Sequence, residues 1–165
     1  MMAKNKPSPP GDVMVQVSQN VTEFNGVIRE MIEVANNVVS QPKFQEEYKQ
    51  HFGDFNLISG LILEAIKHDE LKPMSLGGPY LYKYREYFKK DGPDWLGANF
   101  EQEIDQNNPQ RTALMSLLNI YKKIYKEGGF TEEYMNTMRA HIRKLLKFYS
   151  KTCILVKDYD FWPKV

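Results

Sequence analysis

The stretch NPQRTALMSLLNIYKKIYKEGGFTEEYMNTMRAHIRKLLKFYSK, from Asn108 to Lys151, decides the fold of this chain. It predicts two helices joined by a turn. Asn108 and Pro109 suit the N-cap and first turn of a helix, where the N–H that proline lacks has no helical partner. The glycine pair at 128–129 predicts a left-handed exit from that helix. Thr131 then predicts the cap of the next helix, with glutamates in its first turn.

Apolar residues recur at helical spacing on both sides of this turn, so each predicted helix has one buried face. The first face is Leu114, Leu117, Leu118, Tyr121, Ile124 and Tyr125, and the second is Met135, Met138, Ile142, Leu145, Leu146 and Tyr149.

The N-terminal half predicts one long helix and two shorter ones. The long helix runs from an N-cap at Asp12 to about residue 40, and Gly26 in its middle allows a bend or the close approach of another backbone. Its seam of the coiled-coil type is Val17, Val21, Phe24, Ile28, Met31, Ala35 and Val38. A short helix follows from Gln41 and ends at Gly53. Asp54 caps a third, with the buried face Leu57, Ile58, Leu61, Ile62, Ala65 and Ile66.

The middle of the chain predicts a loop and then an aromatic helix. Residues 72–79, KPMSLGGP, hold two glycines and two prolines and predict a loop without a phosphate-binding motif. Residues 80–90, YLYKYREYFKK, predict a helix with tyrosines on more than one face. We therefore predict an all-α, single-domain helical bundle of five to seven helices, with a long N-terminal helix and a C-terminal helical hairpin. The bundle covers 12–152, between an extended proline-rich arm at 1–11 and an aromatic tail at 153–165.

Composition and charge exclude several classes of protein. A length of 165 residues with 42% hydrophobic and 26% charged residues is typical of one globular domain. The formal net charge of +1 gives no global field that would attract nucleic acid or an acidic membrane. One cysteine excludes an intrachain disulfide, and no apolar run is long enough to span a membrane. Because no apolar segment follows the basic start of the sequence, we expect no secretory signal there. We expect an intracellular, cytoplasmic protein.

The aromatic helix and the aromatic tail are the candidate partner-binding sites. Rings beside cations are typical of protein interfaces, but they also suit a core or base stacking. The tail is too apolar to leave in water without a reason, so it either folds back on the bundle or inserts into a partner. The proline-rich arm is either a loose tail or a strap across a partner. The candidate residues are Tyr80, Tyr82, Tyr87, Tyr159, Phe161 and Trp162.

Basic residues on two predicted helices suggest nucleic-acid binding as the alternative, although a solvated face is the usual explanation for such a stripe. They form stripes at 83–90 and 139–151. The candidate residues are Lys83, Arg85, Lys89, Lys90, Arg139, Arg143 and Lys144.

No residue pattern indicates a catalytic or cofactor site. Glu64 and His68, four apart on one helix, suit a metal ligand pair, but the signature of a di-iron bundle, Glu-x-x-His on two helices plus two more glutamates, is absent. The basic residues before Cys153 could lower the pKa of its thiol, yet no motif ties a base to it. We expect no metal, no cofactor and no enzymatic activity. The sequence favours a protein-interaction or assembly subunit that docks through residues 80–90 and the terminal segments, without naming a specific biochemical activity.

Overall fold

The described part of the chain is mainly helical. The computed structural model describes residues 6–68, 71–90 and 93–161, and within them it has no strand. Three short 3-10 helices lie at Arg85–Phe88 (η1), Pro93–Gly97 (η2) and Phe100–Glu103 (η3). The six α-helices of these ranges are α1 (Gly11–Val39), α2 (Pro42–Glu47), α3 (Lys49–His68), α4 (Lys72–Lys83), α5 (Ala113–Lys126) and α6 (Glu132–Val156). The predicted all-α bundle of five to seven helices is confirmed.

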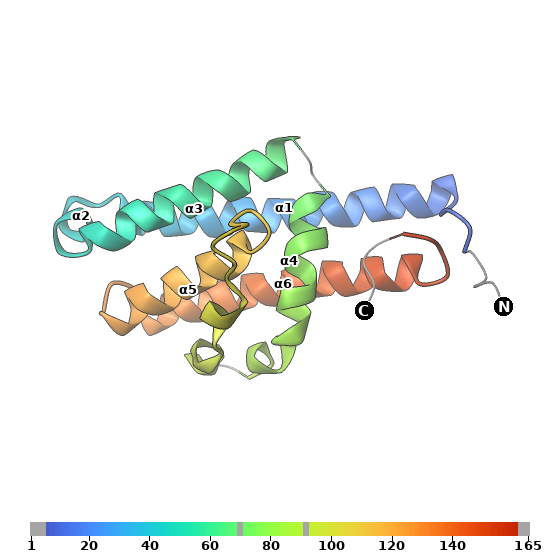
Figure 1. The fold of residues 1–165 in the computed structure, drawn as a ribbon. Helices are drawn as coiled ribbons and strands as arrows, with labels where there is room; N and C mark the ends of the chain where they lie inside the picture. Colours follow the sequence, from blue (N-terminus) through green and yellow to red (C-terminus); the bar gives the residue numbers. More distant parts are fainter. Residues whose placement is uncertain (1–5, 69–70, 91–92, 162–165) are drawn as a thin grey trace.

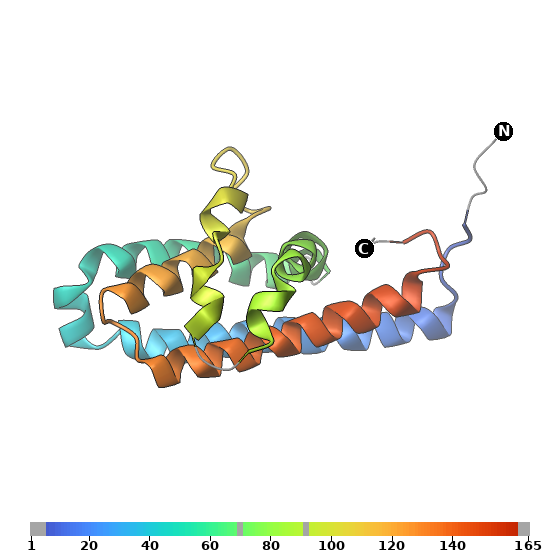
Figure 2. The ribbon, with the colours of Figure 1, turned by 90° about the horizontal axis from the view of Figure 1, so that it is seen from below.

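The helices form two layers (Figures 1 and 2). The long helices α1 and α6 lie antiparallel and side by side in one layer, and they make the most extensive contact in the molecule. In the other layer α3 packs beside α5, and α4 crosses over α6. The N-terminal turns of α1 and the C-terminal turns of α6 project beyond the second layer (Figure 2). We call this helical projection the arm; it is distinct from the proline-rich segment predicted at 1–11.

The seam predicted for the first helix faces the core. Six of its seven members are buried, and Val38 is half-buried. Pro10, not Asp12, occupies the N-cap, and Asp12 is the second residue of the helix. Gly26 is exposed and a Cβ there would meet no atom within 4 Å, so it does not serve a close backbone approach.

The hairpin of α5 and α6 has the predicted turn. Gly128 has a φ of 84°, its N–H donates to the Tyr125 carbonyl, and the Gly129 N–H donates to the Ile124 carbonyl at 2.8 Å, which is the Schellman pattern. The Thr131 hydroxyl accepts a hydrogen bond from the Tyr134 N–H at 3.0 Å and caps α6.

The start predicted for α5 at Asn108 is wrong, because α5 begins at Ala113 after an N-cap at Thr112. The Asp105 N–H donates to the Thr112 hydroxyl at 3.1 Å, and the Asn107 N–H donates to the Asp105 carboxylate at 2.9 Å. These two hydrogen bonds stabilise the turns of the segment from Asp105 to Thr112, which precedes the helix.

The boundary predicted at Gly53 and Asp54 is also wrong. The chain bends at Tyr48, and α3 begins at Lys49 and passes through both residues. The Tyr48 ring packs on Phe44 with centroids 5.0 Å apart, and its hydroxyl donates to the Glu127 carbonyl, so tertiary contacts place the bend.

The loop predicted at 72–79 is a helix, α4, which passes through Pro79. Gly77 and Gly78 are buried where α4 approaches α5 and α6 closely, so they serve packing and do not break the helix. The helix predicted at 80–90 is not continuous, because α4 ends at Lys83 and η1 follows. Beyond it, Phe88, Trp95 and Phe100 form a fully buried ring cluster.

Candidate functional site

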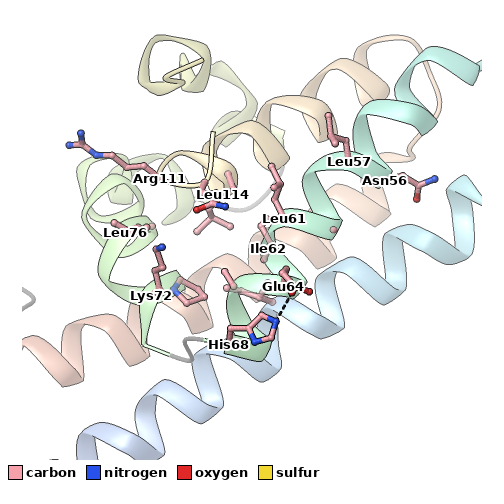
Figure 3. A pocket seen from close by; sticks show the side chains of 17 residues that line it. Asn56, Leu57, Leu61, Ile62, Glu64, His68, Lys72, Leu76, Arg111 and Leu114 are labelled. Carbon is pink, nitrogen blue, oxygen red and sulfur yellow. Dashed lines mark hydrogen bonds and ion pairs between the residues drawn. The ribbon is translucent and has the colours of Figure 1, made fainter. Parts of the chain in front are cut away.

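A groove between α3 and α4 has a volume of about 590 Å³. We call it the α3–α4 groove (Figure 3). One wall is α3, the other is formed by α4 and the start of α5, and Ile28 of α1 contributes to the lining. The apolar residues used below are Ile28, Leu57, Leu61, Ile62, Leu76 and Leu114, and the polar ones are Asn56, Glu64, His68, Lys72, Gln110 and Arg111.

The groove exists because α3 has two apolar rows and only one of them is covered. The covered row is Phe55, Ser59, Ile62 and Ile66. Leu57 and Leu61, predicted to be buried, belong to the other row: Leu57 is 68% exposed and Leu61 is half-buried. Gly60 lies between these leucines, and a Cβ added to it would meet no atom within 4 Å, so the wall is hollow at that point.

The charges of the groove are arranged unevenly. Glu64 and His68 on α3 pair with each other, with 2.5 Å between Nε2 and Oε1. On the opposite side, Figure 3 shows Lys72 reaching toward the mouth and Arg111 extending outward from the edge. Within the residues that the structure describes, neither Lys72 nor Arg111 forms an ion pair.

The tyrosines of the predicted aromatic helix do not form one exposed patch. Tyr80 and Tyr82 are half-buried. The Tyr82 ring lies against the Tyr149 ring, with the two centroids 6.2 Å apart. The Arg85 guanidinium carbon lies over the Tyr82 ring, 4.0 Å from the centroid of that ring. Tyr87 is 43% exposed, and it alone of these three tyrosines is exposed.

The C-terminal segment folds back against the start of the chain. Tyr159 and Phe161 are half-buried, and Trp162 lies outside the described residues. The Asp160 N–H donates to the Pro7 carbonyl at 2.8 Å, and the Lys6 ammonium donates to the Lys157 carbonyl at 3.0 Å. Helix α6 continues to Val156 and takes in the first residues of the predicted tail.

Most cations of the first predicted basic stripe already have partners. Lys83 pairs with Glu103, Lys89 pairs with Glu86 at 2.9 Å, and the Arg85 side chain donates to the Tyr82 carbonyl. The Lys83 ammonium is the main reason why the pKa of the Glu103 carboxyl lies below its ordinary value. Lys90 is exposed.

Cations of the second predicted stripe lie along one face of α6. Arg139 is half-buried and donates to the Phe88 carbonyl, whereas Arg143 and Lys144 are exposed. Lys147 and Lys151 continue the row, each close to the half-buried Phe148 ring. Glu23 and Glu30 of α1 line a shallow hollow together with Lys144, Lys147 and Phe148.

Cys153 is half-buried and His141 is buried among the surrounding helices. Burial raises the pKa of the Cys153 thiol, so the lowered pKa suggested by the neighbouring cations is wrong. His141 is buried, with Nδ1 2.9 Å from the Thr137 carbonyl and Nε2 3.4 Å from a Glu30 oxygen. In the described ranges, no cluster of three or more His, Cys, Asp or Glu residues could hold a metal ion. No helix of those ranges is long and apolar enough to cross a membrane.

Comparison of the chain with protein-family models, curated proteins and solved structures finds no match. The groove and the α6 surface are therefore the features from which a function can be inferred. Sequence reasoning identified part of the α6 row but missed the groove. The sequence contains one signal of the groove: the apolar residues of α3 cover more than half of the helix circumference, which is more than a single packed face needs.

Proposed function

We propose that this chain is a non-enzymatic interaction subunit that docks an acidic partner protein along α6. The docking surface, which we call the α6 stripe, consists of Arg143, Lys144, Lys147 and Lys151. All four are exposed, and their spacing of one, three and four residues places them on one side of the helix. The observation behind this proposal is that none of the four forms an ion pair within the described residues.

An exposed apolar residue extends this surface on the arm. Ile154 follows Lys151 by one helical turn and is 67% exposed. Cations beside an apolar side chain suit a partner that presents both carboxylates and an apolar residue, because charge complementarity steers the encounter and apolar contact slows dissociation. Ile154 belongs to the tail at 153–165 that the sequence predicted to dock, whereas the stripe overlaps the basic row at 139–151 that the sequence suggested for nucleic acid. The tyrosines at 80–87 support docking less, because only Tyr87 remains exposed among Tyr80, Tyr82 and Tyr87.

Nucleic-acid binding is the second candidate, because phosphates would also match an unpaired row of cations. One observation favours a protein over a nucleic acid. At the other predicted cationic surface, residues 83–90, two of the four cations are already paired with Glu86 and Glu103.

Zero-length carbodiimide cross-linking tests the proposal, because it joins lysine amines to carboxylates that are already paired with them. The full chain is incubated with extract from its own cells, with and without nuclease, and the cross-linked peptides are identified by mass spectrometry. The stripe variant replaces Lys144, Lys147 and Lys151 with glutamine. The matched control replaces three exposed lysines on other helices, Lys43, Lys49 and Lys67, and changes the net charge equally.

The expected result is a recurrent acidic peptide of one protein joined to lysines of the α6 stripe. It should be lost in the stripe variant, retained in the control variant, and unaffected by nuclease. Equal capture by both variants would refute the proposal. Capture that disappears after nuclease treatment would favour the nucleic-acid alternative, which direct binding to single- and double-stranded DNA and RNA at several salt concentrations then tests.

A further inference from the structure

We propose that the α3–α4 groove binds a small amphipathic anion, with an unbranched hydrocarbon chain that ends in one carboxylate. This site is separate from the α6 stripe and does not depend on the function proposed for it. The volume of about 590 Å³ lies within the range of small-molecule sites.

The walls of the groove favour a hydrocarbon body. Leu61, Leu76 and Leu114 face the cavity from three elements (Figure 3), and Leu57 stands exposed at its edge. Covering these leucines removes apolar surface from water, which is worth about 25 cal/mol for each Å². The missing side chain at Gly60 leaves room for the ligand at the middle of the α3 wall.

The depth of the groove favours a thin chain over a protein helix. The lining reaches Ile28 of α1, which is only 1% exposed, so the floor of the groove lies against the other layer of the bundle. A helix with its side chains is about 10–12 Å wide and could cover the mouth without reaching this depth. The α3 wall between Asn56 and His68 is about 18 Å long, at about 1.5 Å per residue, which suits an extended chain of more than ten carbons.

The charged edge selects an anionic end group. Lys72 and Arg111 line one side of the groove without ion-pair partners in the described chain, and Gln110 is a further polar residue of the lining. Among the described residues that line the groove, the one carboxylate is that of Glu64, and it is paired with His68. A ligand carboxylate at this edge would therefore meet donors, whereas a ligand cation would face two like charges.

Titration calorimetry with dodecanoate, kept below its micellar concentration, tests this assignment on the full chain. Dodecyltrimethylammonium and dodecanol are the comparison probes, with the same chain length and a positive or neutral end. We expect one dodecanoate per chain and an affinity at least tenfold higher than for the cation. Lys72→Gln should weaken dodecanoate binding by up to about fivefold, the upper range for an exposed charge pair, without changing dodecanol binding.

The substitution Gly60→Leu blocks the groove from within. A Cβ at this position meets nothing within 4 Å, and leucine is a better helix former than glycine, so the fold should not lose stability. Gly53→Leu is the matched control, because Gly53 is also an exposed and open position of α3 but does not line the groove. We expect Gly60→Leu to abolish dodecanoate binding and Gly53→Leu to leave it unchanged.

Three results would overturn the assignment. The first is no dodecanoate binding by the wild-type chain at about 1 mM, a concentration that detects even weak sites. The second is equal affinity for dodecanoate and the cation. The third is unchanged binding in a Gly60→Leu chain whose circular dichroism shows that it is folded.

Discussion

Replacing Gly78 with alanine tests the close approach of α4 to α6. Gly78 is buried, and a Cβ added there would lie 2.2 and 2.4 Å from two atoms of the Tyr149 ring. Tyr149 is 1% exposed and its ring also contacts Tyr82, so the ring has little room to move away. We therefore expect α4 to shift outward or the Tyr149 side chain to leave its rotamer.

The expected loss follows from three contributions. Overpacking of a well-packed core costs about 1–3 kcal/mol, and a rigid buried ring places this site near the upper end of that range. Alanine before Pro79 adds a local clash between its Cβ and the proline ring, which glycine avoids. The third contribution has the opposite sign, because alanine in a helix is more stable than glycine by about 1 kcal/mol. The free energy of unfolding should fall by about 2 kcal/mol, which lowers Tm by roughly 4–8 °C in a chain of this size.

Urea unfolding monitored by far-ultraviolet circular dichroism measures this change, with Gly53→Ala as the control. Gly53 is also in a helix but is exposed and open, so alanine there should raise the free energy of unfolding by up to about 1 kcal/mol. If Gly78→Ala were as stable as the wild type or more stable, the packing of α4 on α6 described above would be wrong.

Three further substitutions test the turn, the ring cluster and one ion pair. Gly128→Ala should lower the free energy of unfolding by about 1–2 kcal/mol, because alanine disfavours a φ of 84°; urea unfolding measures it, and a neutral result would contradict this turn geometry. Trp95→Ala should cost about 3–5 kcal/mol by the same assay, since Trp95 is fully buried between Phe88 and Phe100; a loss below 1 kcal/mol would mean that the cluster is not formed. The pKa of Glu103 is lowered in the folded state, so its contribution to stability is present above pH 4.5 and is lost as the pH falls through the folded pKa. Glu103→Gln should therefore be less stable at pH 7 and show a smaller loss of stability between pH 5 and about pH 3; equal pH dependence in both proteins would argue against the pair with Lys83.

Local signals in the sequence predicted the elements whose ends are determined locally. The hairpin turn at Gly128 and the cap at Thr131 depend on backbone conformation and one side-chain bond, which neighbouring residues supply. The path of α4 could not be predicted in the same way. Its glycines resemble loop residues in sequence, but they allow close packing on Leu114 and Tyr149, which lie about 40 and 70 residues further along the chain.

The groove was beyond sequence reasoning for the same physical reason. Its walls come from α3, α4, the segment at 110–114 and one residue of α1, so no local pattern contains it. Apolar spacing identifies Leu57 and Leu61 as members of a helix face, but only the placement of the neighbouring helices decides whether that face is covered. The α6 row was partly predicted, because four cations of one continuous helix share a side through their spacing alone.

The backbone hydrogen bond from the Asp160 N–H to the Pro7 carbonyl places the two described ends of the chain together at the tip of the arm. A short linker could join these ends, and new termini could be opened at the exposed Gly128 turn without cutting a helix. Such a circular permutant would keep every helix pairing while it reverses the order in which the halves of the bundle are synthesised.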